Sequence, residues 1–241
     1  MSITNIFGHV VALVGAAAIR LRKFEGSDHA QAMGTAPSIP AAKPQGIPTL
    51  KMPTAKGWTG NQTPVAAPGL KVNAFATGLK HPRWIHVLPT GEVLVAEAMG
   101  DNGPIKTAFD YAMYATMKRA AAVGVSMNRI LAFRDADGDG VAESSNVFLE
   151  NLNRPFGMAL AGDTFYVGNT DGVMAFPYTA GAGKITGTGK RLSTFKPGGH
   201  WTRSLLLSPD GQKLYAGVGS LSNIGDNGME AEEGRAAIYE L

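Results

Sequence analysis

The stretch 199-GHWTRSLLLSPDGQKLYAGVG-219 decides the fold, because two apolar-biased runs flank a Pro-Asp-Gly turn. A tight turn between two β-favouring runs predicts a β-hairpin. The same order of polar lead-in, apolar run, turn and second apolar run occurs in 78-GLKHPRWIHVLPTGEVLVAEA-98 and 151-NLNRPFGMALAGDTFYVGNT-170. The chain therefore contains a repeated hairpin unit.

Further β-rich runs lie between and after these hairpins and supply outer strands. Four strands per unit, at a period of about 40 to 50 residues, are typical of a β-propeller blade. A closed propeller needs at least about four blades, and residues 70–241 have room for about three to four. We therefore expect an all-β fold that is an incomplete propeller, a fragment of a larger ring. The outer runs are 128-NRILAFRD-135, 144-SSNVFLE-150, 172-GVMAFPY-178, 190-KRLSTFK-196 and 236-AAIYEL-241.

One segment between the first two hairpins interrupts the β pattern. The run 104-PIKTAFDYAMYATMKRAAAVGVS-126 is rich in Ala, Met, Lys and Tyr and has no Gly until Gly124. Such a composition favours a helix, which we place near 104–124. We expect its aromatic and methionine side chains to pack on the propeller.

The first 69 residues differ in composition from the rest of the chain. The apolar run 6-IFGHVVALVGAAAI-19 is too short to span a bilayer and suits a signal peptide or membrane anchor within residues 1–25, with a short helix as the alternative. Residues 26–69 are rich in Pro, Ala and Gly and predict a linker or an extended arm, which Trp58 could attach to the domain. The β-propeller domain would then span residues 70–241.

Composition excludes several classes of function. The chain has no Cys, which rules out disulfides, thiolate catalysis and cysteine-ligated metals. Its formal net charge of +3 without a basic run gives no indication of nucleic-acid binding. No glycine-rich phosphate loop joins a strand to a helix, so a Rossmann-type cofactor site is not expected.

The segment 135-DADGDGVAE-143 is a candidate calcium loop. Alternating carboxylates around a tight turn present hard oxygen ligands to one point, as Ca²⁺ prefers. The ligands would be Asp135, Asp137, Asp139, the carbonyl of Val141 and Glu143. Asn146 stands where an EF-hand has its bidentate Glu, and the flanks read as strands. The alternative is a charged hairpin that binds no metal. The loop 223-NIGDNGMEAEE-233 offers further acidic and carbonyl oxygens.

The segment 200-HWTR-203 is a candidate site because it leads into an inner hairpin. Inner strands of propeller blades border the central channel, and the segments leading into them line its mouth. Aligning the turns of the repeats places Arg203 level with Arg83, and Arg154 lies near the same position in the middle repeat. Guanidinium groups bind carboxylates, and His200 can transfer a proton near neutral pH. The alternative is a polar surface histidine at an ordinary strand start.

Beyond these patterns, an ordered set of stretches resembles the sorbosone dehydrogenase family. That family belongs to the soluble quinoprotein glucose/sorbosone dehydrogenases. The resemblance covers about residues 45 to 241, and it rests on the order of the stretches and on no single motif. The stretches are 75-FATGLKHPRWIHVLPTGEVLVAEA-98, 128-NRILAFRDADGDGVAE-143, 152-LNRPFGMAL-160, 200-HWTRSLLLSPDGQKLY-215 and 217-GVGSLSNIGDNGMEAEEGRAAIYE-240.

The resemblance implies a six-bladed propeller that holds pyrroloquinoline quinone (PQQ) in its central well, with Ca²⁺ beside it. It implies oxidation of an aldose or sugar aldehyde at C1. His200 would be the general base that takes the hydroxyl proton while hydride passes to the quinone. Arg203 would stabilise the charge on the reduced cofactor, and Trp201 could stack on cofactor or sugar. Arg83 joins the cofactor contacts only through the repeat alignment.

Two other classes of function stay open at this point. One is a non-catalytic propeller that serves as a binding module. The other is a lactonase-type propeller hydrolase, which would need a ring of acidic and amide side chains where this chain has Arg and His. For the dehydrogenase we expect a sugar substrate, an unidentified electron acceptor and no nucleic acid. We expect a periplasmic or membrane-anchored location, with possible membrane association through the N-terminal segment.

Overall fold

The computed structural model of the chain describes residues 33–37, 53–59, 62–100 and 103–241. The chain divides into two units, Met1–Met52 and Pro53–Leu241, and the strands found among the described residues lie in the second. The predicted signal peptide or anchor within residues 1–25 lies outside the described residues. Among those that are described, no helix is both long and apolar enough to cross a membrane.

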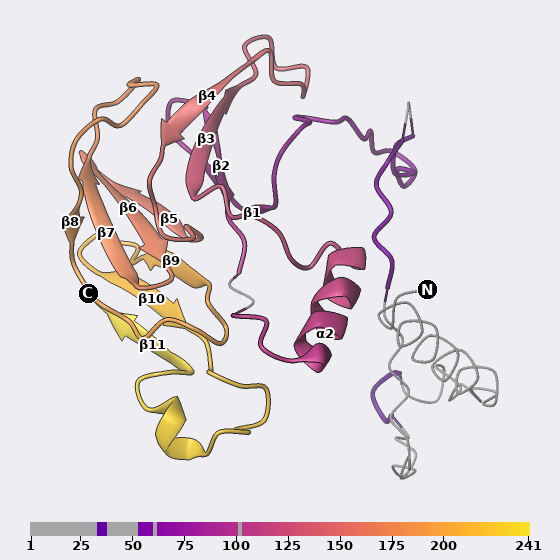
Figure 1. The fold of residues 1–241 in the computed structure, drawn as a ribbon. Coiled ribbons are helices and arrows are strands. Elements are labelled where there is room, and N and C mark those ends of the chain that lie inside the picture. The colour runs from indigo at the N-terminus through magenta and orange to yellow at the C-terminus, as the bar shows by residue number, and fades with distance from the viewer. Residues whose placement is uncertain (1–32, 38–52, 60–61, 101–102) are drawn as a thin grey trace. The chain divides into compact units, whose positions relative to one another are not determined.

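The described part of the second unit contains three antiparallel sheets, each built from strands that follow one another along the chain (Figure 1). This arrangement confirms the repeated hairpins and the all-β, incomplete propeller fold. The first sheet has β1 (Pro82–Val87), β2 (Val93–Glu97), β3 (Arg129–Arg134) and β4 (Ser144–Leu149). The second has β5 (Met158–Ala161), β6 (Thr164–Asn169), β7 (Gly172–Pro177) and β8 (Lys190–Arg191). The third has β9 (Arg203–Leu207), β10 (Leu214–Val218) and β11 (Ala237–Glu240).

Strand β8 is shorter than the predicted 190–196 run. Lys190 and Arg191 pair with β7, and the Leu192 N–H still donates to the Val173 carbonyl of β7 at 2.9 Å. The chain then turns inward, buries Phe195 and donates the Phe195 N–H to the carbonyl of Asp171 at 2.9 Å. Regular strand pairing thus ends before Phe195, and the ring of Phe195 is buried in the core.

Side-chain alternation fixes which face of the third sheet is buried. In β9, Arg203 and Leu205 are buried, whereas Ser204 and Leu206 are exposed. Leu214, Ala216 and Val218 of β10 are also buried. The turn between these strands needs Gly211, whose φ of +69° lies in the left-handed region. The Pro-Asp-Gly sequence therefore fixes the register that turns Arg203 inward.

Two hydrophobic clusters fill the spaces between neighbouring sheets. The first joins sheets one and two, and its largest members are Phe148 and Phe165, with ring centroids 5.3 Å apart. The second joins sheets two and three through Val173, Phe195 and Leu205, among others. Each fully buried large apolar side chain contributes about 1.5–3 kcal/mol. Sheets stacked face to face around such cores are what a propeller requires.

The first strands of the three sheets lie next to one another. Strand β1 contacts β5, and β5 contacts β9. Aromatic side chains bridge the same ends of these strands: Trp84 lies 4.9 Å from Phe156, and Phe156 lies 6.3 Å from Trp201, measured between ring centroids. The segments leading into the inner strands therefore meet at one end of the sheets.

The predicted helix is present as α2 (Ala108–Arg119), in the connection between β2 and β3 (Figure 1). Thr107 and Asp110 form a capping box at its N-terminus. No residue of α2 is fully buried, and Phe109 and Tyr111 are exposed, whereas Met113, Tyr114 and Met117 are half-buried, so packing on the propeller stays a prediction. At the C-terminal end of α2, Arg119 donates from Nε to the Thr54 hydroxyl of the arm, and its carbonyl accepts the Ala55 N–H.

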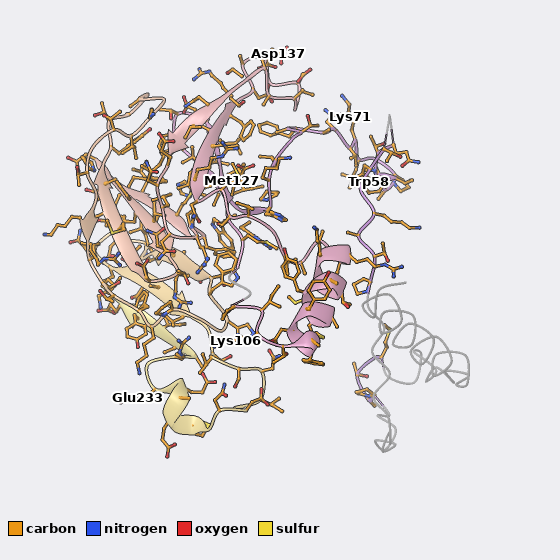
Figure 2. The ribbon with its side chains drawn as sticks, in the orientation of Figure 1. Trp58, Lys71, Lys106, Met127, Asp137 and Glu233 are labelled. Carbon is orange, nitrogen blue, oxygen red and sulfur yellow. The ribbon has the colours of Figure 1, made fainter. Side chains whose placement is uncertain are left out.

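The arm and the last loop complete the described chain. Trp58 is 69% exposed, so it does not attach the arm as expected (Figure 2). A short 3₁₀ helix, η2 (Met229–Glu232), lies between β10 and β11. It belongs to the loop that supports the candidate site.

Candidate active site

Arg83 and Trp201 meet where the segments leading into β1 and β9 come together. The Arg83 guanidinium carbon lies 5.7 Å from the centroid of the Trp201 ring, within cation–π range. Arg83 also donates from Nε to the Ala98 carbonyl at 2.8 Å and approaches the Met99 sulfur with Nη2 at 2.7 Å. A Cβ on Gly100 would lie 2.6 Å from Trp201 Nε1, so the glycine makes room for the indole. The structure thus brings two predicted cofactor-binding residues together.

His200 is exposed and is held by Ser220, the second residue after β10. Its backbone N–H donates to the Ser220 carbonyl at 2.9 Å. Its ring Nδ1 lies 3.0 Å from that carbonyl oxygen and 2.9 Å from the Ser220 hydroxyl oxygen. Sequence reasoning missed Ser220, because nothing in 217-GVGS-220 indicates that a residue after one strand contacts the lead-in to another.

Arg203 is placed differently from the sequence expectation. Its side chain is fully buried, and it donates from Nη1 to the carbonyls of His200 (2.8 Å) and Thr202 (3.0 Å) and from Nη2 to that of Lys196 (3.1 Å). Burial lowers the pKa of the Arg203 guanidinium and nearby Arg235 lowers it further, whereas Asp171 raises it. This placement gives Arg203 a role in holding the loop, in place of the direct ligand contact that the repeat alignment predicts.

A second arginine supports the same loop, which we call the His200 loop and define as residues 196–202. Arg235 is 8% exposed and donates to the carbonyls of Gly198 (3.0 Å) and Pro197 (2.6 Å). The two guanidiniums together bind five loop carbonyls, those of Lys196, Pro197, Gly198, His200 and Thr202. The loop that carries His200 therefore rests on two buried cations.

The loop after β10 is fixed by Glu232. Its carboxylate accepts hydrogen bonds from the Leu221 N–H (2.6 Å), the Ser222 N–H (3.0 Å) and the Ser222 hydroxyl (3.0 Å). The Leu221 N–H bond is the main reason why the pKa of Glu232 is lowered. Glu232, an acid of the 223–233 loop, thus binds backbone amides next to Ser220. These hydrogen bonds hold Ser220 and its neighbours in place.

Arg154, the third aligned arginine, lies in the segment before β5. Its φ is +51°, and its backbone N–H donates to the Asn128 side-chain oxygen at 3.0 Å. A different ion pair lies at the end of β2, where the fully buried Glu97 binds Arg129 Nε at 2.7 Å and the N–H of Lys80. The charge of Glu97 is balanced by Arg129, and its oxygens accept hydrogen bonds from within the protein. Glu97 therefore has the contacts of a structural residue.

The acidic loop, residues 135–143, connects β3 to β4 and brings the four predicted carboxylates together. Ligand oxygens of Asp135, Asp137, Asp139 and Glu143 lie within 4.8 Å of one another. Asp137 lies at the tip of this connection (Figure 2). A cluster of hard oxygens at an exposed turn fits Ca²⁺. The participation of the Val141 carbonyl stays a prediction.

The acidic loop keeps its shape through its own backbone. Asp135 accepts the N–H groups of Gly138 (2.7 Å) and Gly140 (2.9 Å), and Asp139 accepts that of Val141 at 2.8 Å. Glu143 accepts the Ala136 N–H at 2.6 Å. Each of these carboxylates therefore has a backbone partner within the loop.

The sheets, their stacking and the meeting of their inner strands define a β-propeller. Residues 64–241 match the TrAA12-like family, and the chain belongs to that family. No curated protein matches the chain.

Solved structures share this fold. The Carbohydrate-Active Enzymes family AA12 protein from Trichoderma reesei, in its iodide structure, has a TM-score of 0.53 and 22% identity, over 76% of this chain and 42% of its own. Its calcium structure has a TM-score of 0.53 and 20% identity, over 73% and 39%. The holo PQQ domain of pyranose dehydrogenase from Coprinopsis cinerea has a TM-score of 0.50 and 20% identity, over 69% and 34%. The chain thus spans less than half the length of each.

Proposed function

We propose that the protein is a PQQ-dependent oxidoreductase that oxidises an aldose-type sugar or sugar aldehyde. The observation that carries the proposal is the meeting of the inner-strand lead-ins, where Arg83 and Trp201 stack and Trp201 adjoins exposed His200 in sequence. Family membership and the propeller fold shared with the PQQ domain of a pyranose dehydrogenase support it. A sorbosone or glucose dehydrogenase specificity is the finer form of this proposal.

The residues present fit the chemistry of PQQ, a flat aromatic quinone that carries carboxylates. Trp201 offers an indole face for stacking, and Arg83 places a cation over that ring at 5.7 Å. Arg83 is an exposed residue, and a guanidinium is the group that binds carboxylates most readily. When bound, PQQ supplies a two-electron acceptor for the sugar's C–H bond.

His200 would act as the general base on the sugar hydroxyl. An imidazole nitrogen with a free lone pair can accept the proton of a hydroxyl group. Arg203 and Arg235 contribute through the loop carbonyls, because they keep the His200 backbone in one position. A general base must be held within hydrogen-bond reach of the substrate proton that it removes. The two arginines help to hold the His200 backbone in a fixed position.

Calcium has a separate candidate position in the acidic loop. Asp135, Asp137, Asp139 and Glu143 would supply carboxylate oxygens, and Val141 its carbonyl. We propose a modest affinity, because the backbone N–H groups already occupy part of the carboxylate oxygens. A partner electron acceptor, and an exported or membrane-anchored location directed by residues 1–25, complete the proposal.

The test is reconstitution of the full-length protein with PQQ and Ca²⁺, followed by dye reduction with a panel of aldoses. His200→Gln should lower kcat by at least about a hundredfold, the usual worth of a general base. The control is His81→Asn, since His81 has a φ of +51° that asparagine tolerates. Unchanged turnover in His200→Gln would remove the histidine from the chemistry.

An absorbance titration with PQQ separates an enzyme from a binding module that lacks the cofactor. Arg83→Gln should weaken PQQ binding about tenfold, because it removes a charge-assisted contact. The matched control is Arg134→Gln, an exposed arginine on β3 that pairs with Glu92. Absence of saturable PQQ binding in the unsubstituted protein would contradict the proposed function.

A further inference from the structure

Ser220 contacts the His200 ring through two oxygens. The Ser220 carbonyl oxygen lies 3.0 Å from Nδ1, and the hydroxyl oxygen lies 2.9 Å from the same nitrogen. The carbonyl also accepts the backbone N–H of His200 at 2.9 Å. One residue thus binds both the backbone and the ring of the candidate base.

The direction of these hydrogen bonds follows from the donors available. A carbonyl oxygen can only accept a hydrogen bond. The Ser220 hydroxyl has one proton, which it donates to the Ser222 carbonyl at 2.7 Å. Its oxygen therefore faces Nδ1 as an acceptor as well. Because both groups near Nδ1 are acceptors, Nδ1 must carry the ring proton, and the neutral imidazole keeps its lone pair on Nε2.

We infer that Ser220 is a positioning residue that holds His200 in the Nδ1–H tautomer, so that Nε2 is the nitrogen that accepts the substrate proton. The catalytic consequence rests on the proposed function, whereas the tautomer itself does not. Only the Nδ1–H form presents a basic Nε2, so the population of that form limits the working base. Both Ser220 oxygens belong to neutral groups, so the residue selects the tautomer without placing a carboxylate beside the ring.

The surroundings keep Ser220 in this position. A Cβ on Gly219 would lie 2.6 Å from the His200 Cβ, so the glycine allows the chain to pass directly against the histidine. On the other side, Glu232 binds the N–H groups of Leu221 and Ser222. The His200 backbone is in turn held by Arg203 through its carbonyl. Both partners of the contact are thus anchored by residues outside it.

The first experiment reads the tautomer directly and needs no cofactor. Nitrogen-15 NMR of the imidazole groups in the full chain, at a pH where histidine is neutral, distinguishes a protonated Nδ1 from a protonated Nε2. The His200 signals are assigned by their loss in His200→Gln. We expect Nδ1–H in the unsubstituted chain and a smaller share of it in Ser220→Ala, which keeps the carbonyl but lacks the hydroxyl. Ser220→Thr should restore the original share.

The second experiment measures the consequence in the PQQ-loaded protein. Ser220→Ala should lower kcat about tenfold with little change in KM, the size of effect typical of an orienting partner. Ser220→Thr should recover most of it. The control is Ser208→Ala, which removes a turn hydroxyl that binds Asp210 in the same sheet.

Three results would overturn the inference: an Nε2–H tautomer of His200 in the unsubstituted chain, an unchanged tautomer in Ser220→Ala, or equal losses in Ser220→Ala and Ser220→Thr. If the NMR result is as expected and no sugar is oxidised, the proposed function fails and the positioning contact stands.

Discussion

The His200 loop and the acidic loop both present polar side chains at the surface, but different parts of the protein hold them. Buried arginines from β9 and the segment before β11 bind five carbonyls of the His200 loop. The acidic loop is closed chiefly by its own carboxylates and its own N–H groups. The His200 loop should therefore depend on the fold around it, whereas the acidic loop should tolerate change and respond to metal.

The largest effect should come from removing the buried cation under the His200 loop. Arg203→Met leaves the carbonyls of Lys196, His200 and Thr202 without their donors. We expect the free energy of unfolding to fall by about 3 kcal/mol, as for lost hydrogen bonds to a buried charge. Arg134→Met is the control: its pair with Glu92 is exposed on the arginine side, and such pairs contribute less than about 1 kcal/mol. Equal urea midpoints for the two variants would show that Arg203 does not hold the loop.

A pair of glycines compares the two loops directly. Gly199 and Gly138 have φ values of +60° and +76°, so alanine brings left-handed strain of about 1–2 kcal/mol at either. At Gly199 the new Cβ would also lie 2.5 Å from the Leu221 Cα, whereas nothing lies within 4 Å at Gly138. Gly199→Ala should therefore destabilise by about 2 kcal/mol more than Gly138→Ala, measured by urea unfolding. A difference near zero would mean that the 219–221 segment moves away without cost.

Local sequence was enough to predict most of the fold. Each hairpin carries its turn residues and its apolar alternation within one stretch of about twenty residues. The hairpins at 78–98, 151–170 and 199–219 could therefore be recognised from their own sequence alone. The signal for the helix near 104–124 was equally local, but the packing of that helix depends on residues far away in the sequence. Amphipathic composition cannot say whether a face is covered, and Phe109 and Tyr111 are exposed.

The site was predicted only in part, for the same reason. His200 and Trp201 stand in one short motif, and the repeat alignment brought in Arg83. Ser220, Glu232 and Arg235 act on that motif from distant positions, and no spacing rule connects them. Arg203 was expected to face the ligand, yet period-two alternation places it on the same face as buried Leu205. That alternation was the available signal for its burial.

Calcium should act on the acidic loop and not on the His200 loop, and its effect should be stabilising. If the acidic loop binds one ion, Ca²⁺ at about ten times its Kd should stabilise the chain by about 1.4 kcal/mol. We expect a Kd of about 0.1–1 mM by isothermal titration calorimetry, within the weak range of calcium sites. Asp137→Asn should weaken this binding, and Asp163→Asn, at an exposed turn between β5 and β6, should not. Failure of the unsubstituted chain to bind Ca²⁺ would leave the loop as a charged hairpin.

The smallest effect should come from Glu232, which supports the His200 loop from the side of Ser220. Hydrogen bonds from the Leu221 and Ser222 N–H groups, and nearby Arg235, lower its pKa below the ordinary 4.5. A lowered pKa means that the carboxylate stabilises the fold at neutral pH, and that this contribution is lost as pH falls below 4.5 through the folded-state pKa. Glu232→Gln should therefore have a lower urea midpoint at pH 7 and a flatter decline in acid, so that the two curves converge at low pH. Glu230→Gln, on the same 3₁₀ helix, should follow the unsubstituted chain throughout. Parallel curves for Glu232→Gln and the unsubstituted chain would mean that the amides of the 221–222 segment do not depend on this charge.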